Sequence, residues 1–202
     1  MAIEHRREHV LDAALRLVLR DGYTAATMEA IAREANLAKP RVYAAYPGRG
    51  PLLLALLERE QQRAVAALDI AMPEFTADTD VATTLEAAAT SLLHAVATNP
   101  GPWRLLNLNA DEAPPEVHAH IADTHEFALS NLRALLAWGR EHQPGIDDYD
   151  VELLAVSLLA VGEQLIRLTL ADPDRYPTDR LTDFIRTTLG AFDPARTTPS
   201  DS

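Results

Sequence analysis

The sequence predicts an all-α protein, and three features support that prediction. Leu and Ala, both good helix formers, dominate a chain of 202 residues that is 48% hydrophobic. Val, Ile and aromatic residues nowhere alternate with polar residues over a useful length, as a half-buried strand requires. Apolar residues instead recur at helical spacing in segments separated by Pro and Gly. A chain of this length can bury a sizeable core as one large domain or two small ones.

A pair of short helices joined by a tight turn is predicted near the start of the chain. A first helix over residues 8–21 ends at Gly22, a residue that suits the position after a helix. Thr27 is a candidate N-cap for the second helix, and Asn36 tolerates the left-handed backbone that ends it sharply. Pro40 lies in the first turn of a third helix. The pattern fits a DNA-binding helix-turn-helix, and it also fits an αα-hairpin inside a helical bundle.

A longer stretch carries a more specific signal. Its matching runs are LVLRDGY at 17–23, TMEAIA at 27–32, LAKPRVY at 37–43, YPGR at 46–49 and LL at 52–53. On these runs, residues 10–57 resemble the DNA-binding domain of the TetR family of bacterial transcriptional regulators. The chain departs from the usual pattern at several positions: Asn36 replaces a glycine, Arg41 replaces a small residue, and Tyr46 replaces Phe.

The resemblance implies about nine helices in two domains. Residues 1–50 would form a three-helix DNA-binding domain, and residues 51–192 a helical effector-binding and dimerisation domain. Residues 193–202 are rich in Pro, Thr and Ser, a composition that predicts a disordered tail.

The resemblance also implies which residues contact DNA. The predicted base-reading residues are Lys39, Arg41 and Tyr43, and the predicted phosphate contacts are Thr27, Tyr46 and Arg49. His5, Arg6 and Arg7, in a polar arm before the first helix, either touch phosphate or are solvated.

The charge distribution is compatible with a DNA-facing end. The net charge is −12, yet residues 1–50 hold eight Lys and Arg against six Asp and Glu, a net of +2. The acidic remainder would repel DNA and favour one docking orientation. An acidic body is also ordinary for a soluble bacterial protein, so the asymmetry adds little by itself.

The second domain is predicted to contain five helices and a short apolar segment. The helices cover residues 51–71, 81–98, 115–141, 149–170 and 178–191, the apolar segment covers residues 103–109, and Pro and Gly break the chain between most of them. The helix over 151–170 is apolar on nearly its whole circumference, which requires burial on more than one side. It fits either the homodimer interface that the resemblance implies or the centre of a monomeric bundle. The predicted interface residues are Leu159, Glu163, Arg167, Leu181, Phe184 and Ile185.

A small-molecule effector site is expected among these helices, because the resemblance places one there. The residues predicted to line it are Trp103, His94, Asn107, Asn109, His125, Trp138 and Gln164. For the tryptophans, core packing is the alternative role, and for the histidines, a surface position.

Signatures of catalysis and metal binding are missing from the sequence. There is no cysteine, no G-x-S-x-G or H-E-x-x-H motif, and no Glu followed by His three residues later, as a di-iron bundle needs. We therefore expect no enzyme activity and no cofactor. The longest apolar run, residues 153–162, is shorter than a membrane span, so we expect a cytoplasmic protein without a membrane partner.

Together these features predict a homodimeric transcriptional regulator. The most direct hypothesis is a repressor that binds a palindromic operator in double-stranded DNA and is released by a small, largely apolar effector. The alternatives are a helical bundle that binds a ligand or protein without binding DNA, and a helical-bundle enzyme.

Overall fold

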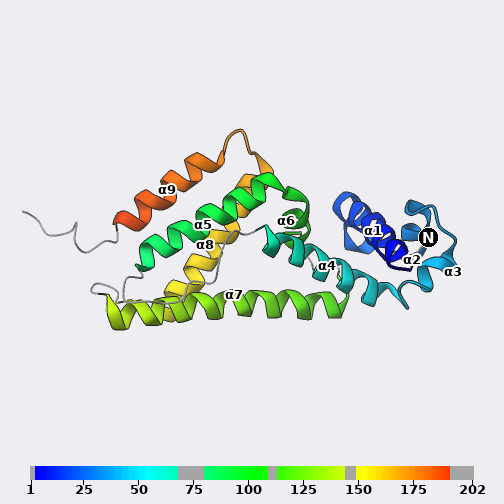
Figure 1. Ribbon diagram of the computed structural model, residues 1–202, viewed down its shortest axis with the longest axis horizontal. Helices are drawn as coiled ribbons and strands as arrows, with labels where there is room; N and C mark the ends of the chain where they lie inside the picture. Colours follow the sequence, from blue (N-terminus) through cyan, green and yellow to red (C-terminus); the bar gives the residue numbers. More distant parts are fainter. Residues whose placement is uncertain (1–2, 68–79, 109–112, 144–148, 192–202) are drawn as a thin grey trace, which may run out of the picture. The chain divides into compact units, whose positions relative to one another are not determined.

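The computed structural model describes residues 3–67, 80–108, 113–143 and 149–191, which form nine α-helices and no strand (Figure 1). The helices are α1 Ile3–Ala25, α2 Met28–Glu34, α3 Lys39–Tyr43, α4 Arg49–Ala66, α5 Val81–Thr98, α6 Pro100–Leu106, α7 Pro115–His142, α8 Val151–Ala171 and α9 Thr178–Ala191. The predicted all-α fold is confirmed.

Several helix starts differ from the predicted ones, among them that of α4, which is at Arg49 rather than residue 51. Helix α1 begins at Ile3 rather than residue 8, so the described part of the polar arm, residues 3–7, is helical. Helix α6 begins at Pro100, because proline lacks an N–H that the first helical turn would leave unsatisfied anyway. The N-cap of α8 is Asp150, whose carboxylate accepts from the backbone N–H groups of Glu152 and Leu153. Asp147 and Asp148, the predicted caps, lie outside the described residues.

The chain divides into two compact units. The first contains α1 to α4, α6 and the beginning of α7 up to Thr124, and the second contains α5, the rest of α7, α8 and α9. This division differs from the predicted boundary after residue 50. The reason is that α4 turns its apolar face, including Leu52 and Leu56, into the core of the first unit.

The core of the first unit is formed mainly by α1, α2 and α4. Val10 and Val18 of α1, Ile31 of α2 and Val42 of α3 are fully buried together. Burying each such side chain stabilises the fold by about 1.5–3 kcal/mol. This burial holds the short helices α2 and α3, which are too short to be stable alone.

Charged residues also join α4 to α1. Glu60 of α4 is 1% exposed, and its Oε1 lies 2.8 Å from Arg59 and 3.0 Å from Arg63. The Arg59 guanidinium continues to Glu8 at 2.9 Å and Asp12 at 2.8 Å, both on α1. Because every charge here has a partner of opposite sign, the buried carboxylate is tolerated.

The second unit has two small apolar clusters. One contains Leu135 and Leu136 of α7 with Ala155 of α8, and the other contains Leu93 of α5 with Leu165 of α8. Helix α5 packs against both α8 and α9. Salt bridges from Arg133 of α7 to Glu152 of α8 supplement this packing.

Helix α8 corrects the expectation that no segment is long and apolar enough to span a membrane. With 21 residues it is long and apolar enough, by length and composition, to cross a membrane, although the run over 153–162 alone is not. A helix that packs on several sides in a soluble protein has the same composition, so this property is weak evidence for a membrane span.

Candidate functional site

Helices α2 and α3 form a helix-turn-helix held by local interactions. The Thr27 hydroxyl caps α2 by accepting from the Ala30 N–H at 3.1 Å, as predicted. Asn36 has φ 51°, the left-handed conformation predicted for the turn. His9 of α1 contacts the Ala35 carbonyl at 2.7 Å, which satisfies an acceptor at the end of α2. The buried side chain of Val42 then fixes which face of α3 points outward.

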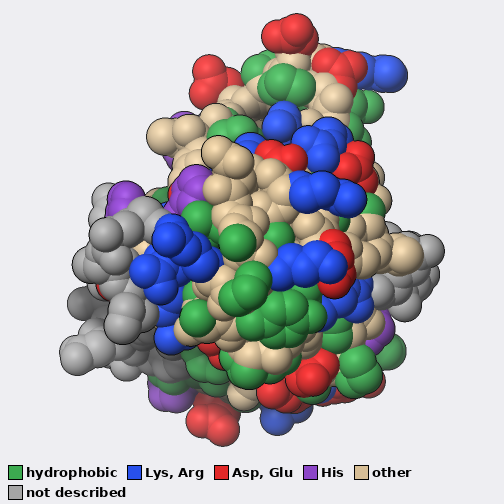
Figure 2. All heavy atoms as spheres, turned by 90° about the vertical axis from the view of Figure 1, so that its right-hand side faces the viewer, with side chains coloured by type: hydrophobic (Ala, Val, Ile, Leu, Met, Phe, Trp, Pro, Cys, Tyr) green, Lys and Arg blue, Asp and Glu red, His purple; other side chains and the backbone are tan. Residues whose placement is uncertain are grey.

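Four of the six predicted DNA contacts are exposed on this motif: Thr27, Lys39, Arg41 and Tyr43. Arg41 and Tyr43 have no side-chain hydrogen bond or ion pair with the rest of the described chain. Lys39 has one, to the Glu29 carboxylate of α2 at 2.9 Å. That hydrogen bond lowers the pKa of Glu29. Figure 2 shows Lys and Arg side chains interspersed with Asp and Glu on a face of the molecule, a mixed distribution rather than a continuous basic patch.

The other two predicted phosphate contacts are engaged inside the first unit. Tyr46 is 3% exposed, and the Arg7 guanidinium lies 4.8 Å from the centre of its ring. Arg49 donates from Nε to the Ala26 carbonyl at 3.1 Å and from Nη2 to the Tyr23 carbonyl at 2.6 Å. These contacts give Tyr46 and Arg49 a role in holding the unit together, which differs from the predicted phosphate contact.

Sequence reasoning missed Glu29 and Arg7. A carboxylate in the first turn of α2 is expected to interact favourably with the helix dipole. Nothing in the local sequence shows that the side chain of Lys39, ten residues later, forms an ion pair with it. For Arg7, the sequence predicts either a phosphate contact or a solvated side chain. Its stacking on Tyr46 follows from the packing of α1 and could not be read from spacing.

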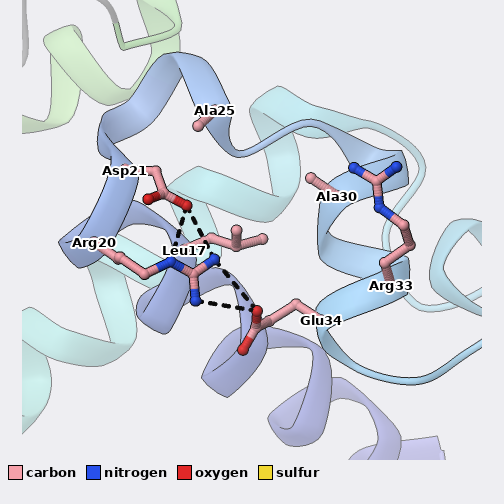
Figure 3. A pocket seen from close by; sticks show the side chains of 7 residues that line it. All are labelled: Leu17, Arg20, Asp21, Ala25, Ala30, Arg33 and Glu34. Carbon is pink, nitrogen blue, oxygen red and sulfur yellow. Dashed lines mark hydrogen bonds and ion pairs between the residues drawn. The ribbon is translucent and has the colours of Figure 1, made fainter.

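A hollow of about 420 Å³ lies beside α1 and α2 (Figure 3). In this hollow the Arg20 guanidinium lies 2.9 Å from the Asp21 carboxylate and 3.4 Å from the Glu34 carboxylate, so these carboxylates neutralise the charge of Arg20. Arg33 points away from that cluster and is exposed. Arg20 is therefore not free to bind an anionic ligand in this hollow.

The predicted effector residues are distributed over both units. In the first unit, Trp103 is 7% exposed, its indole Nε1 has no hydrogen-bond partner among the described residues, and its carbonyl accepts from Asn107. In the second unit, Trp138 stacks on His142 with ring centroids 4.7 Å apart. Asn109 lies outside the described residues.

The three remaining effector residues are exposed in the second unit. His125 of α7 lies 3.7 Å from Glu163 of α8, and Gln164 accepts from Arg167 at 3.1 Å. His94 lies on α5 beside a groove of about 850 Å³. Small, hydroxyl and charged side chains line this groove, including Thr83, Thr90, Ser91, His94, Thr98 and Arg186. Ala67, Ala87 and Ala95 also line it, so the groove offers both apolar and polar surface to a ligand.

The predicted interface residues divide into two groups. Leu181 and Ile185 are 5% and 7% exposed because they pack in the second unit against Leu93 and Leu165. Phe184 of the same helix is 57% exposed, while Leu159 is half-buried. Glu163 and Arg167 are 3.9 Å apart on α8.

An exposed apolar surface extends along α8 near these positions. Leu153, Val156 and Val161 are 65%, 45% and 49% exposed. Large apolar side chains that project together into solvent mark an interaction surface in many proteins. Among the described residues, no group of three or more His, Asp or Glu side chains could hold a metal ion.

Comparison with known proteins identifies the helix-turn-helix. Residues 10–56, from α1 into α4, match the family described as bacterial regulatory proteins, tetR family. The chain belongs to the TetR family. TetR-family relatives extend over more of the chain. It is 26% identical over 167 residues to the HTH-type transcriptional activator FasR of Mycolicibacterium smegmatis, covering 83% of this chain and 73% of that protein.

Another TetR-type relative matches more closely over a shorter stretch. The HTH-type transcriptional repressor KstR of Rhodococcus jostii is 39% identical over 62 residues, which cover 31% of this chain and 29% of that protein. The chain is thus a TetR-family DNA-binding transcriptional regulator and not an enzyme.

Solved structures share the fold of both units. The fatty acid degradation regulator FadR of Bacillus halodurans aligns with a TM-score of 0.71 at 19% identity, covering 95% of this chain and 96% of that chain. FadR of Bacillus subtilis in complex with stearoyl-CoA aligns with a TM-score of 0.69 at 17% identity, covering 90% and 96%. At these identities the likeness establishes the fold alone.

Proposed function

We propose that this TetR-family regulator is a homodimeric repressor that binds a palindromic operator through α3 and is released by a small effector. The observation that carries the proposal is the surface of α3, where the side chains of Arg41 and Tyr43 are exposed and have no partner in the described chain. An arginine in this position can donate two hydrogen bonds to a guanine edge. Lys39 lies at the first turn of α3, the part of a recognition helix that reaches base edges.

The test is binding to the DNA that flanks the gene encoding this protein. Fluorescence anisotropy with overlapping duplexes should show one segment bound far more tightly than a scrambled duplex, with affinity falling as salt rises. Loss of binding to every duplex at low salt would instead support the helical bundle that does not bind DNA. Relatives include an activator and a repressor, so a reporter driven by the bound segment is also needed. Its expression should rise when the regulator is removed.

The proposed homodimer suits the geometry of DNA recognition. Two recognition helices fill successive half-sites when they lie about 34–36 Å apart. The exposed apolar surface of α8, with Phe184 of α9, offers the second unit an area for self-association. Burying it between two copies would also explain why α8 is apolar on the side that faces solvent in one copy.

The effector would bind beside α5. The groove there is large enough for a small molecule, and the Arg186 guanidinium on its wall is held by Glu86 at 2.7 Å and Asp183 at 2.9 Å. FadR of Bacillus subtilis was solved with stearoyl-CoA, so a long-chain acyl thioester is the first probe. Coupling between effector and DNA sites is typically about 1–3 kcal/mol, roughly 5–150-fold in affinity.

Titration of stearoyl-CoA with and without operator tests this part of the proposal. Operator should weaken binding of the thioester by the same factor by which the thioester weakens binding of operator. Coenzyme A without the acyl chain is the matched control ligand, and Thr90→Phe, which fills the groove, is the matched variant. Equal affinity in the presence and absence of operator would exclude stearoyl-CoA as the effector.

A further inference from the structure

The Lys39–Glu29 ion pair joins the two helices of the DNA-binding motif. Lys39 Nζ and Glu29 Oε1 are 2.9 Å apart, and the side chains are 58% and 48% exposed. An ion pair between side chains this exposed adds little to the stability of the unit. Lys39 is exposed on α3 like Arg41 and Tyr43, and this gives the pair a consequence for DNA binding.

Glu29 changes what Lys39 can do at a DNA surface. Binding to arbitrary DNA comes almost entirely from cations that contact phosphate and release counterions. A carboxylate that holds the ammonium of Lys39 competes with phosphate for it, and its own charge repels the DNA backbone. Arg41 has no such competitor, because no carboxylate of the described chain forms an ion pair with it.

The same carboxylate restricts where Lys39 points. A lysine side chain is flexible and loses rotamer freedom when it is ordered. With one N–H directed to Glu29, the ammonium keeps two further donors, and its position is tied to α2. A base edge that lies at this position can be reached without opening the pair, whereas a phosphate elsewhere cannot.

We propose that Glu29 is a specificity-determining residue, which withholds Lys39 from phosphates and orients it toward base edges in the operator. This inference rests on the proposed function, in which α3 enters the major groove. It assigns the discrimination to a residue of α2 that contacts α3 across the turn, rather than to a residue of α3 itself.

The experiment measures affinity for operator and for a random duplex at several salt concentrations with full-length Glu29→Gln. Affinity for the random duplex should rise several-fold, with a salt slope steeper by about 0.9 because one more cation contacts phosphate. Operator affinity should rise less, so the ratio of operator to random affinity should fall. An unchanged or increased ratio would overturn the inference.

A double-mutant comparison shows whether the effect passes through Lys39. In a Lys39→Met background, Glu29→Gln should alter random-duplex affinity no more than Glu58→Gln does. Glu58 is an exposed carboxylate on α4 that forms no ion pair in the described chain, so its variant reproduces the change in net charge alone. A full Glu29→Gln effect without Lys39 would mean that general repulsion acts, and would overturn the inference.

Two further readouts separate this inference from a structural role and from the proposed function. Glu29→Gln should leave the thermal midpoint nearly unchanged, since the pair is exposed. Random-duplex binding by the wild-type protein at low salt is measured first. Its absence would refute the proposed function together with the inference, whereas wild-type binding with no response to Glu29→Gln would refute the inference alone.

Discussion

Arg41 and Arg49 carry the same charge in opposite surroundings. Arg41 extends from α3 without a side-chain partner in the described chain, while Arg49 donates to the carbonyls of Tyr23, near the end of α1, and Ala26, in the connection before α2. Only the free guanidinium can bind a new acceptor without breaking existing hydrogen bonds. The two residues therefore lead to different predictions.

Substitution of Arg41 should lower DNA affinity at particular base pairs. A bidentate contact to guanine contributes about 1–3 kcal/mol of discrimination. Arg41→Ala should lose that amount on the best operator and lose less on operators mutated at the contacted position. Anisotropy on a panel of single-base operator variants measures this effect. Arg104→Ala, an exposed cation on α6, is the control, and equal losses on all duplexes would show that Arg41 contacts only phosphate.

Substitution of Arg49 should act mainly on stability. Its two hydrogen bonds connect α4 to the turn before α2, and a hydrogen bond to a charged group contributes about 1.5–3 kcal/mol. Arg49→Ala should therefore lower the free energy of unfolding by at least about that amount in urea denaturation. An unchanged free energy of unfolding combined with a flatter salt slope of DNA binding would instead return Arg49 to its predicted phosphate contact.

Tyr23 makes stability depend on alkaline pH. Burial raises the pKa of Tyr23 to about 12, above the ordinary value of about 10. The unfolded chain loses this proton first, so the contribution to stability is complete below pH 10 and declines as the pH rises toward 12. In Tyr23→Phe the free energy of unfolding should decline less over this range than in the wild type. Tyr43→Phe, at an exposed position, should behave like the wild type.

At the scale of elements, the attachment of α4 to α1 depends on a buried carboxylate. Glu60 holds Arg59 and Arg63, and Arg59 continues to α1. Removing one member of a buried ion pair leaves uncompensated charge and costs about 3–5 kcal/mol. Glu60→Gln should fall near the lower end of this range, because Arg63 is half-exposed and can turn to solvent.

Chemical denaturation of Glu60→Gln and Glu58→Gln measures that difference. The exposed Glu58 is two residues away on the same helix, and its variant should change the free energy of unfolding by less than about 0.5 kcal/mol. Equal effects in the two variants would show that the network does not hold α4 to the first unit.

At the scale of the whole molecule, the proposed dimer rests on the outer surface of α8 and α9. The wild-type protein should have about twice the 22.1 kDa mass of one chain in light scattering at micromolar concentration. Phe184→Asp should shift the mass toward one chain, because a charge buried without a partner at an interface is costly. Val65→Asp, at an exposed apolar residue of α4, should remain dimeric, and a wild-type mass of one chain would contradict the dimer.

Most of the fold could be predicted because its signals are local. Helix formers, caps and breakers act within a few residues, so the position of Thr27 at the start of α2 and of Asn36 in the turn followed from sequence. The predicted break after residue 98 is present at Asn99, but it is short, because proline is compatible with a first helical turn and α6 begins at Pro100. The predicted end at Gly22 corresponds to a non-helical φ of 82°, although helical hydrogen bonding continues on both sides.

The candidate site was predicted less completely, because it depends on contacts between distant residues. Sequence placed Lys39, Arg41 and Tyr43 on the exposed face of α3, since only Val42 has the inward position there. It could not show that Arg49 donates hydrogen bonds to the carbonyls of Ala26 and Tyr23, which lie 23 and 26 residues earlier in the chain.

Sequence by itself determined the helical class, the helix-turn-helix and its outward-facing residues, because helix periodicity and capping are encoded within single turns. Only the tertiary structure decided which charges remain free. Glu29 reaches Lys39, and Glu60 is buried under two arginines, because folding brings together residues from different helices. The tertiary structure likewise buries Leu181 and Ile185 and leaves Phe184 exposed. Helix α9 has apolar residues on two faces, and only one of these faces packs against the rest of its own chain.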